Sequence, residues 1–508
     1  MGKNLYGWTL MAVVISSSHS AAQNYETTKE KVQQILEQSK KQLAEDYGID
    51  DFEEYKRQKR QEFEDYRKRM NAEFAEYMRK AWPKYAVKKG EPVPKRPEPP
   101  KPVVKKSDEK PTIAAVPLGQ IIPQRREPQT KPTPLVKVPT APVAPVEKGF
   151  SFSFYGTPCT VPLEARHRFR LSGVDENRVA DGWNVLSGEQ YTAVVEACLS
   201  LRNTLQLCDW GYLRLLERMT ESFFGASGQN EARLMQMFIL TQSGYKVRLA
   251  RTGQQLCLLL PSEDVVYEYS YVLIRGQRYY VIDKERNHQS LAILDHEFPK
   301  EQSFSLRMDF EPLLAVNSPV TNTLTSKRYA ELSVQLAVNK NLIDFYNDYP
   351  LTDDWSVYVC SSLSQQVKEQ LYPVLRQAIA GKSEKTAANM LINFVQTALQ
   401  YKTDEEQFGT ERPLFGDETL YYPFSDCEDR AILYAVLVRE LLGLEVVLIY
   451  YPQHLATAVC FREDVAGSYF THDGRRYVVC DPTYIGASIG ESMPQFRQSK
   501  ATVIQIGQ

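Results

Sequence analysis

The stretch that decides the fold of the C-terminal part is residues 422–443, which read YPFSDCEDRAILYAVLVRELLG. Residues 431–442 are apolar almost all round, so we expect a buried helix that stops at Gly443. Cys427 then lies in the first turn of this helix, where unpaired backbone N–H groups and the helix dipole stabilise an anion. This position predicts a favoured thiolate at Cys427, and the same N–H groups could hold an oxyanion.

Three strands are expected after this helix, over residues 444–451, 455–461 and 475–481. His454 stands just before the second strand, and Asp481 ends the third. In an antiparallel pair these two strand ends are neighbours, so the two side chains can touch. The imidazole could then accept the thiol proton while the carboxylate fixes its tautomer. The predicted catalytic residues are therefore Cys427, His454 and Asp481.

The order of these motifs resembles the transglutaminase-like superfamily. The tetrapeptide DPTY follows the third strand, at residues 481–484, and the stretch IGASIG at residues 485–490 is also similar. The resemblance covers about residues 386–494 and implies a papain-like fold with a Cys-His-Asp triad on Cys427, His454 and Asp481. Ser425 departs from the pattern, because many members have Gly there.

The upstream half repeats the pattern without its chemistry. Residues 230–243 predict a helix that ends at Gly244, followed by a strand over residues 245–250. Aligning Gly244 with Gly443 puts Gly228 at the position of Cys427 and Gln255 at that of His454. After a shift of one residue, Asp283 aligns with Asp481, so only the aspartate of the three catalytic residues is retained. We interpret this half as a degenerate, pseudo-enzyme copy of the same fold. Chance similarity between two α+β sequences is the alternative.

Interleaved helical and β patterns from Gly149 onward predict the α+β class. The 508 residues are enough for two or three domains. The expected parts are a signal peptide, a charged helical region, a Pro-rich linker, the degenerate transglutaminase-like domain and the transglutaminase-like catalytic domain, over residues 1–22, 23–85, 86–148, 149–340 and 341–508.

The first residues are typical of a secretory signal. Lys3 is followed by a short apolar run over residues 8–15 and by small residues at 20–22. The run is too short to span a bilayer. We expect export to the periplasm or the extracellular space, with no integral membrane segment after cleavage. A buried N-terminal helix is the alternative.

The charged region carries an apolar stripe at helical spacing, from Phe63 through Phe74 to Trp82. A solvated helical stalk or hairpin is expected, and a coiled coil that binds a protein partner is the alternative. The prolines of residues 86–148 predict an extended spacer that holds the C-terminal part away from these helices. A ligand for a proline-binding domain is the other interpretation.

A formal net charge of −2 gives no support to nucleic-acid binding, and eight scattered cysteines are not a disulfide framework. Cys460 and Cys480 could pair, or be small buried side chains. Gln407 could supply a second oxyanion donor. We expect an exported thiol acyl-transfer enzyme that acts on peptide or glutamine-type amides of a protein or peptide substrate, needs no metal or organic cofactor, and favours hydrolysis over transamidation. A non-catalytic binding or scaffold protein is the alternative.

Overall fold

The computed structural model describes residues 52–94, 103–106, 115–122, 134–135, 149–282, 288–317 and 321–506. The chain divides into two compact units, residues 1–70 and 71–508. The expected signal peptide lies outside the described residues. Within the described part, no helix is both long enough and apolar enough to cross a membrane. Helices and short strands alternate along the chain, which confirms the α+β class.

The charged N-terminal region contains one long helix, α2 (Phe52–Met78), and residues 23–51 lie outside the described part. Charged side chains pair along its exposed surface, as Lys59 does with Glu62. The end of the helix is not a solvated stalk. In the unit of residues 71–508, the Phe74 ring lies 4.9 Å from Trp183 and 5.2 Å from Phe298. The apolar stripe therefore ends in the globular core, whereas coiled-coil pairing stays a prediction.

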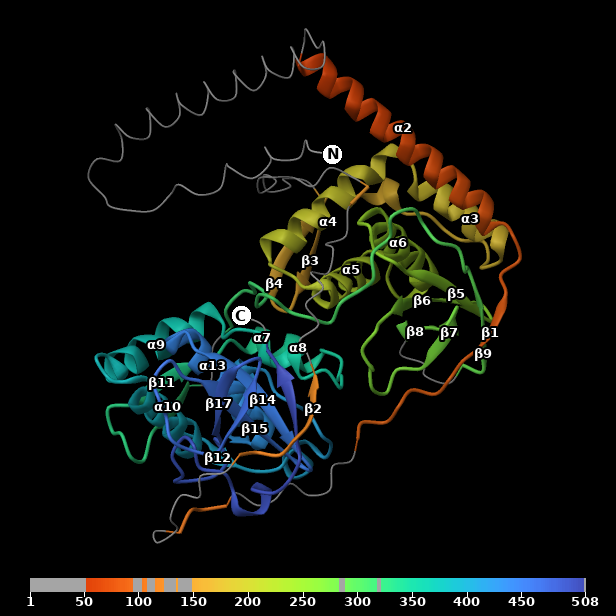
Figure 1. Cartoon of the computed structure of the whole chain (residues 1–508). Helices are drawn as coiled ribbons and strands as arrows, with labels where there is room; N and C mark the ends of the chain where they lie inside the picture. Colours follow the sequence, from red (N-terminus) through yellow and green to blue (C-terminus); the bar gives the residue numbers. More distant parts are fainter. Residues whose placement is uncertain are drawn as a thin grey trace, which may run out of the picture. The chain divides into compact units, whose positions relative to one another are not determined.

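The upstream half of the larger unit combines four main helices with a β hairpin and a six-stranded sheet (Figure 1). Its helix α6 packs on β5 and β6. The elements are β1 (Lys84–Ala86), β3 (Phe150–Phe154), β4 (Thr157–Val161), α3 (Glu176–Leu186), α4 (Thr192–Thr204), α5 (Asp209–Phe224), α6 (Gln229–Gln242), β5 (Arg248–Thr252), β6 (Gln255–Pro261), β7 (Tyr271–Ile274), β8 (Gln277–Ile282) and β9 (Ser290–Ile293).

The downstream half places a second sheet against the buried helix α13, which packs on β14 and β15. Its helices are α7 (Lys340–Asn347), α8 (Ser356–Val359), α9 (Gln365–Ile379), α10 (Glu384–Ala398), α11 (Asp404–Phe408), α12 (Gly416–Tyr421) and α13 (Cys427–Leu442). Its strands are β2 (Leu118–Ile122), β12 (Gln400–Tyr401), β13 (Phe424–Ser425), β14 (Glu445–Tyr451), β15 (His454–Cys460), β16 (Tyr469–His472), β17 (Arg475–Cys480) and β18 (Ala501–Gln505).

The two sheets share one strand order. The downstream sheet runs β16-β17-β15-β14-β18-β2 and the upstream sheet runs β7-β8-β6-β5-β9-β1. The register agrees as well, because His454 opens its hairpin opposite Tyr451 and Gln255 opens its hairpin opposite Thr252. The outermost strands differ, since β2 is parallel to β18 whereas β1 is antiparallel to β9.

Two elements differ from the sequence-based expectation. Strand β16 lies between the expected strands of residues 455–461 and 475–481, where no strand was predicted, and it pairs with β17 through the turn at Asp473 and Gly474. Both turn residues have positive φ, at 48° and 72°, the conformation that favours a two-residue hairpin turn. A hairpin of β10 (Thr321–Thr325) and β11 (Ser333–Ala337) lies before the expected boundary at residue 340 but packs on α9 and α10 of the downstream half.

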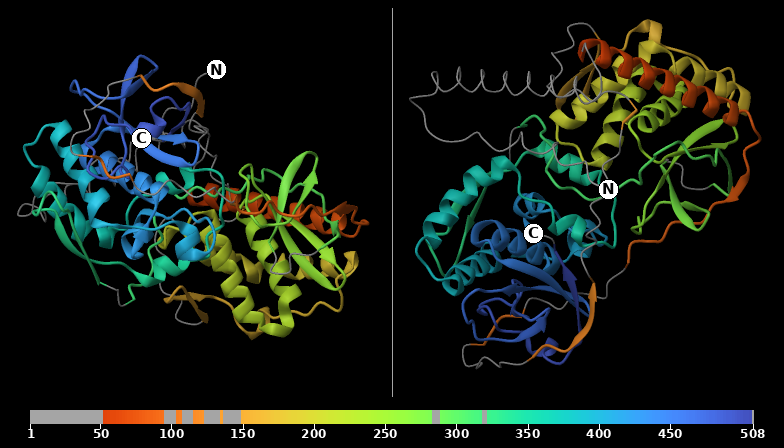
Figure 2. Two further views of the ribbon diagram at one scale, coloured as in Figure 1. Left: turned by 90° about the horizontal axis from the view of Figure 1, so that it is seen from below. Right: turned by 45° about the horizontal axis from the view of Figure 1, so that its top comes forward.

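The Pro-rich linker is not a free spacer where it is described. Strand β2 joins the edge of the downstream sheet, and Val104 forms a β bridge with Ile485 (Figure 2, with β2 in orange). Val116 is buried in the core of that sheet. Apolar linker residues pair here because the outer edge of β18 offers unpaired backbone groups. These parts of the segment 86–148 therefore lie on the domain that they were expected to hold at a distance.

Candidate active site

The fold delivers the three predicted residues from three different element ends. Cys427 is the first residue of α13, His454 is the first residue of β15, and Asp481 directly follows β17. Strands β15 and β17 are antiparallel, so the start of one lies beside the end of the other. All three residues are enclosed, with 2%, 1% and 3% of their surfaces exposed.

His454 and Asp481 form a direct pair. The imidazole Nε2 lies 2.9 Å from Asp481 Oδ2. The other carboxylate oxygen, Oδ1, accepts the backbone N–H groups of Thr483 and Tyr484 at 2.9 and 3.3 Å. A carboxylate can only accept, so in the neutral imidazole the proton is on Nε2 and the lone pair is on Nδ1. Nδ1 is buried and has no hydrogen-bond partner among the described residues, so this nitrogen is free to act as a base.

Gln396 of α10 positions the segment that follows Asp481. Its side-chain amide donates to the carbonyl groups of Tyr484 and Ala487 at 2.8 and 3.1 Å, and to that of Asp481 at 3.3 Å. Its oxygen accepts the N–H of Gly486. The buried side chain of Gln396 thus connects the segment after Asp481 to α10, the helix that packs on α13.

Cys427 does not have the favoured thiolate that the helix N-terminus predicts. Its thiol donates to Glu428 Oε2 at 3.0 Å. Burial, together with the negative charges of Glu428 and Asp426, raises the pKa of the Cys427 thiol well above its usual range, and the backbone N–H of Leu455 only partly opposes this shift. The Leu455 contact places the sulfur at the start of β15, but among the described residues no hydrogen bond joins the thiol to His454 Nδ1. The helix dipole is outweighed because the thiol is removed from water among carboxyl groups.

A group of buried acidic side chains surrounds the thiol. Burial and the charges of Glu428 and Asp429 raise the pKa of Asp426 well above its usual range. Burial and neighbouring negative charge act in the same direction on Asp404 and on Asp429, and they raise the pKa of Asp429 to about 8. Oxygen atoms of Asp404, Asp426 and Asp429 lie within 4.8 Å of one another, a spacing at which they could hold a divalent cation.

We expect the free energy of unfolding to fall as the pH rises from about 4 to about 8. The unfolded chain loses its aspartate protons near pH 3.9. The folded chain keeps the proton of Asp429 up to about pH 8, so it binds more protons across this interval. Stability is then lost with rising pH, by up to about 1.4 kcal/mol per pH unit for each retained proton.

Urea unfolding between pH 5 and pH 8, with a chelator present, measures this slope. Asp429→Asn should make the slope shallower, because the substituted side chain has no proton to lose. The exposed Asp464 provides the control, and Asp464→Asn should leave the slope as it is in the unsubstituted protein. Equal slopes in all three proteins would show that Asp429 ionises normally in the folded state.

Sequence reasoning missed Arg430, which is 1% exposed. Its guanidinium donates to Ser425 Oγ at 3.2 Å and to the carbonyls of Leu399 and Gln396 at 3.0 and 3.5 Å. It also lies over the ring of Tyr401, 5.3 Å from its centre. Arg430 therefore joins the start of α13 to the short parallel strands β12 and β13. A buried arginine one turn after the nucleophile is visible in the sequence, but its partners are not.

Other predicted roles have different outcomes. The side-chain amide of Gln407 donates to the carbonyl of Phe424 at 3.4 Å, so this donor is not aimed at Cys427. Cys460 and Cys480 do not pair, and none of the eight cysteines, all of which lie in the described part of the chain, forms a disulfide bond. Phe496 was not predicted at all. Its ring stacks on the His454 imidazole, with a centroid distance of 4.8 Å and an interplanar angle of 4°.

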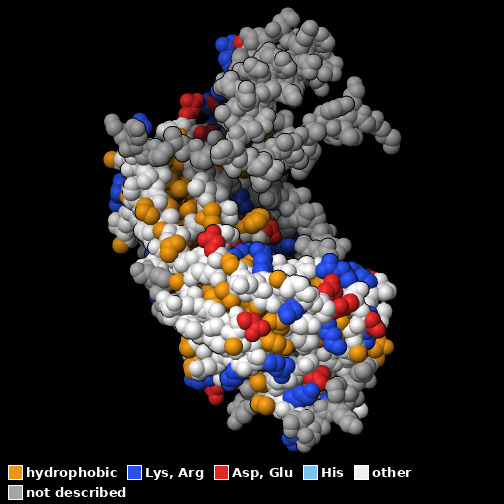
Figure 3. Space-filling model, turned by 90° about the vertical axis from the view of Figure 1, so that its left-hand side faces the viewer, with side chains coloured by type: hydrophobic (Ala, Val, Ile, Leu, Met, Phe, Trp, Pro, Cys, Tyr) orange, Lys and Arg blue, Asp and Glu red, His pale blue; other side chains and the backbone are white. Residues whose placement is uncertain are grey.

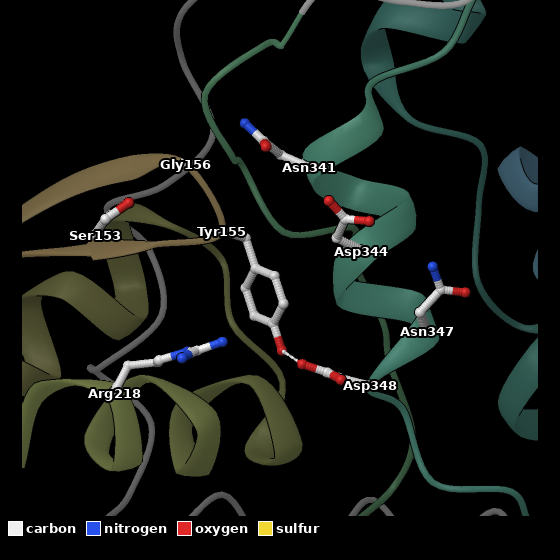
Figure 4. Close-up of a pocket in the computed structure, with 8 residues that line it drawn as sticks. All are labelled: Ser153, Tyr155, Gly156, Arg218, Asn341, Asp344, Asn347 and Asp348. Atoms are coloured by element: carbon white, nitrogen blue, oxygen red, sulfur yellow. Dashed lines mark hydrogen bonds between the residues drawn. The ribbon is translucent and has the colours of Figure 1, made fainter. Parts of the chain in front are cut away.

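A polar cavity of about 520 Å³ lies away from these residues (Figure 4). Its walls come from the β3–β4 hairpin, α5 and α7, and the Tyr155 hydroxyl donates to Asp348 across it at 2.7 Å. None of the three predicted catalytic residues lines it. The lining residues are Ser153, Tyr155, Gly156, Arg218, Asn341, Asp344, Asn347 and Asp348.

The surface agrees with the near-neutral charge. On the face drawn in Figure 3, Lys and Arg are interspersed with Asp and Glu and with scattered hydrophobic side chains. This face therefore lacks the continuous basic surface that binds a phosphate backbone, as far as the described residues extend.

Comparison with known proteins adds no relative to this picture. No family model matches the chain, and no curated protein and no solved structure matches it.

Proposed function

We propose that the downstream half is a transglutaminase-like thiol acyl-transfer enzyme that acts on peptide or glutamine-type amide bonds. The observation that carries the proposal is the His454–Asp481 pair, whose buried Nδ1 has no partner among the described residues and belongs to the residue just before Leu455, the backbone contact of the Cys427 sulfur. An imidazole oriented by a carboxylate, next to a thiol at a helix N-terminus, is the arrangement that nucleophilic catalysis requires.

The reaction follows from the protonation states. Nδ1 of His454 accepts the Cys427 proton, and the sulfur forms a bond to the carbonyl carbon of the amide. The imidazolium, stabilised by Asp481, returns this proton to the nitrogen as the C–N bond breaks, which releases an amine and leaves a thioester. Water or a second amine then attacks the thioester and restores the thiol. Because water is abundant outside the cell, we favour hydrolysis over transamidation.

Glu428 must release the thiol before this sequence begins. In this conformation the Cys427 thiol donates to Glu428 Oε2, and its sulfur lies 3.0 Å from that oxygen. Burial and the neighbouring negative charges keep the thiol neutral. The proposed enzyme is therefore at rest in this conformation. A change that opens the site also lowers the thiol pKa, because renewed contact with water removes the largest cause of its rise.

Incubation with a peptide library and a labelled primary amine tests the proposal. The unsubstituted protein should cleave peptides or incorporate the amine, and Cys427→Ala should lower that rate by at least about 10³-fold. Cys460→Ala is the matched control and should be fully active, because Cys460 lies at the far end of β15. Equal rates for Cys427→Ala and the unsubstituted protein would rule out a reaction at this thiol.

We propose that the upstream half is a degenerate copy of the downstream fold. The shared strand order and hairpin register support this, since Gln255 occupies the strand position of His454. Asp283, the aspartate expected to be retained, lies outside the described residues. The Gln255 side chain cannot serve as a base at neutral pH. The role that we propose for the upstream half is therefore to bind substrate or to shape the cleft of the downstream half.

The second candidate is a non-catalytic binding protein built on the same fold. The enclosure of Cys427 and its raised thiol pKa favour this alternative. The library experiment separates the two when it includes Phe496→Ala, which removes the ring that stacks on His454. A latent enzyme should gain activity in this variant, whereas a scaffold gives no product in any of the proteins.

A further inference from the structure

One loop closes the proposed active site. Residues 485–501, here called the closing loop, run from the segment after Asp481 to the first residue of β18. Phe496 on this loop stacks on His454 and also on Tyr451, with ring centroids 4.8 and 5.1 Å apart. Phe496 is 8% exposed, so its ring separates the imidazole from solvent on this side.

Linker residues hold this loop at its beginning. The backbone N–H of Lys105 donates to the carbonyl of Ile485, and the N–H of Ile485 donates to the carbonyl of Val103, both at 2.9 Å. This reciprocal pair is a short piece of parallel β pairing. It starts four residues after Asp481, on the same segment that Gln396 ties to α10.

The same linker holds the middle and the end of the loop. The Lys105 ammonium lies 2.5 Å from Glu491 Oε1, and both side chains are largely shielded from solvent. At the far end, the N–H of Ala501 donates to the carbonyl of Pro117 at 2.9 Å, and β2 continues beside β18. Val116 anchors this stretch, because its side chain is buried in the sheet core and its N–H donates to Tyr469.

We propose that residues 103–106 and 115–122 form a clasp that keeps the thiol site latent by holding the closing loop over His454. The proposal rests on the proposed function and adds its regulation. With the clasp seated, Phe496 is held on the imidazole and Cys427 stays out of reach of a substrate carbonyl. Displacing these linker residues frees the loop at its start, middle and end together, so the site opens without any change in the triad itself.

The rate at which iodoacetamide alkylates Cys427, followed by mass spectrometry of the Cys427 peptide in the full-length protein, tests the clasp. Lys105→Glu places a negative charge against Glu491 and should raise the rate at least tenfold. Lys106→Glu is the matched control, since Lys106 is the exposed neighbour, and it should leave the rate unchanged. Combining Lys105→Glu with Glu491→Lys restores the ion pair and should return labelling to the slow rate.

Phe496→Ala provides a second route, because it removes the cover while the clasp stays seated, and it should also speed labelling. Equal rates for Lys105→Glu and Lys106→Glu would overturn the clasp, as would failure of the charge exchange to restore slow labelling. The result is separate from catalysis. Faster labelling of Lys105→Glu without peptide turnover would support the clasp and reject the proposed enzyme function. Peptide turnover with unchanged labelling would support the enzyme function and reject the clasp.

Discussion

Asp481→Asn should lower kcat/KM by about 10³- to 10⁴-fold while the fold is retained. The reason lies in the two backbone N–H groups, of Thr483 and Tyr484, that donate to Oδ1. They will select the carbonyl oxygen of the new amide, which turns its NH₂ group toward His454 Nε2. Nε2 must then be unprotonated to accept, so the ring proton moves to Nδ1. This tautomer cannot take the proton of Cys427.

Turnover of a peptide substrate identified with the library measures this loss. His454→Ala should be at least as damaging, because it removes the base itself. Asp473→Asn is the control, since Asp473 lies in the exposed β16–β17 turn, and it should keep full activity. Activity of Asp481→Asn within a factor of three of the unsubstituted protein would mean that the His454–Asp481 pair is structural.

Arg430→Met should destabilise the protein by about 3–5 kcal/mol. Methionine fills a similar volume, so the loss reports the guanidinium and not a cavity. Without it, Ser425 Oγ and the carbonyl of Leu399 lose their buried donor. The cost is that of leaving these buried acceptors without their charged donor, because the nearby carboxyl groups of Asp426 and Asp429 already keep their protons.

Chemical denaturation gives the free energy of unfolding for this comparison. Arg439→Met in the same helix is the matched control. Arg439 is only partly buried and donates to the carbonyl of Val359, so its loss should cost about 1 kcal/mol. Similar values for the two variants would mean that the buried hydrogen bonds of Arg430 stabilise the fold no more than the partly buried one of Arg439.

The local elements of the site were predictable from sequence because each carries its own signal. The apolar run that stops at Gly443 predicts α13 as Cys427–Leu442, and the structure has the same bounds. Short apolar runs bounded by turn residues likewise predict β14 and the end of β17. When the strand that begins at His454 pairs antiparallel with the strand that ends before Asp481, the two residues are neighbours, although β16 lies between these strands in the sequence.

The state of the thiol could not be predicted in this way. A helix N-terminus by itself favours the thiolate. The opposite result depends on Glu428 turning toward the sulfur and on complete enclosure of the site. Enclosure depends on Phe496, which is far from Cys427 in sequence and carries no motif.

What the sequence determines by itself is therefore most of the helices and strands around the site, since short-range periodicity and tight turns decide them. The meeting of His454 with Asp481 follows only when β15 pairs with β17, and β16 lies between these two strands in the sequence. Only the tertiary structure decides that the linker joins the sheet, that Arg430 secures the start of α13, and that Cys427 holds its proton. These features depend on burial and on charges brought together from distant segments. Their energies vary with distance and with exclusion of water, and a linear sequence records neither.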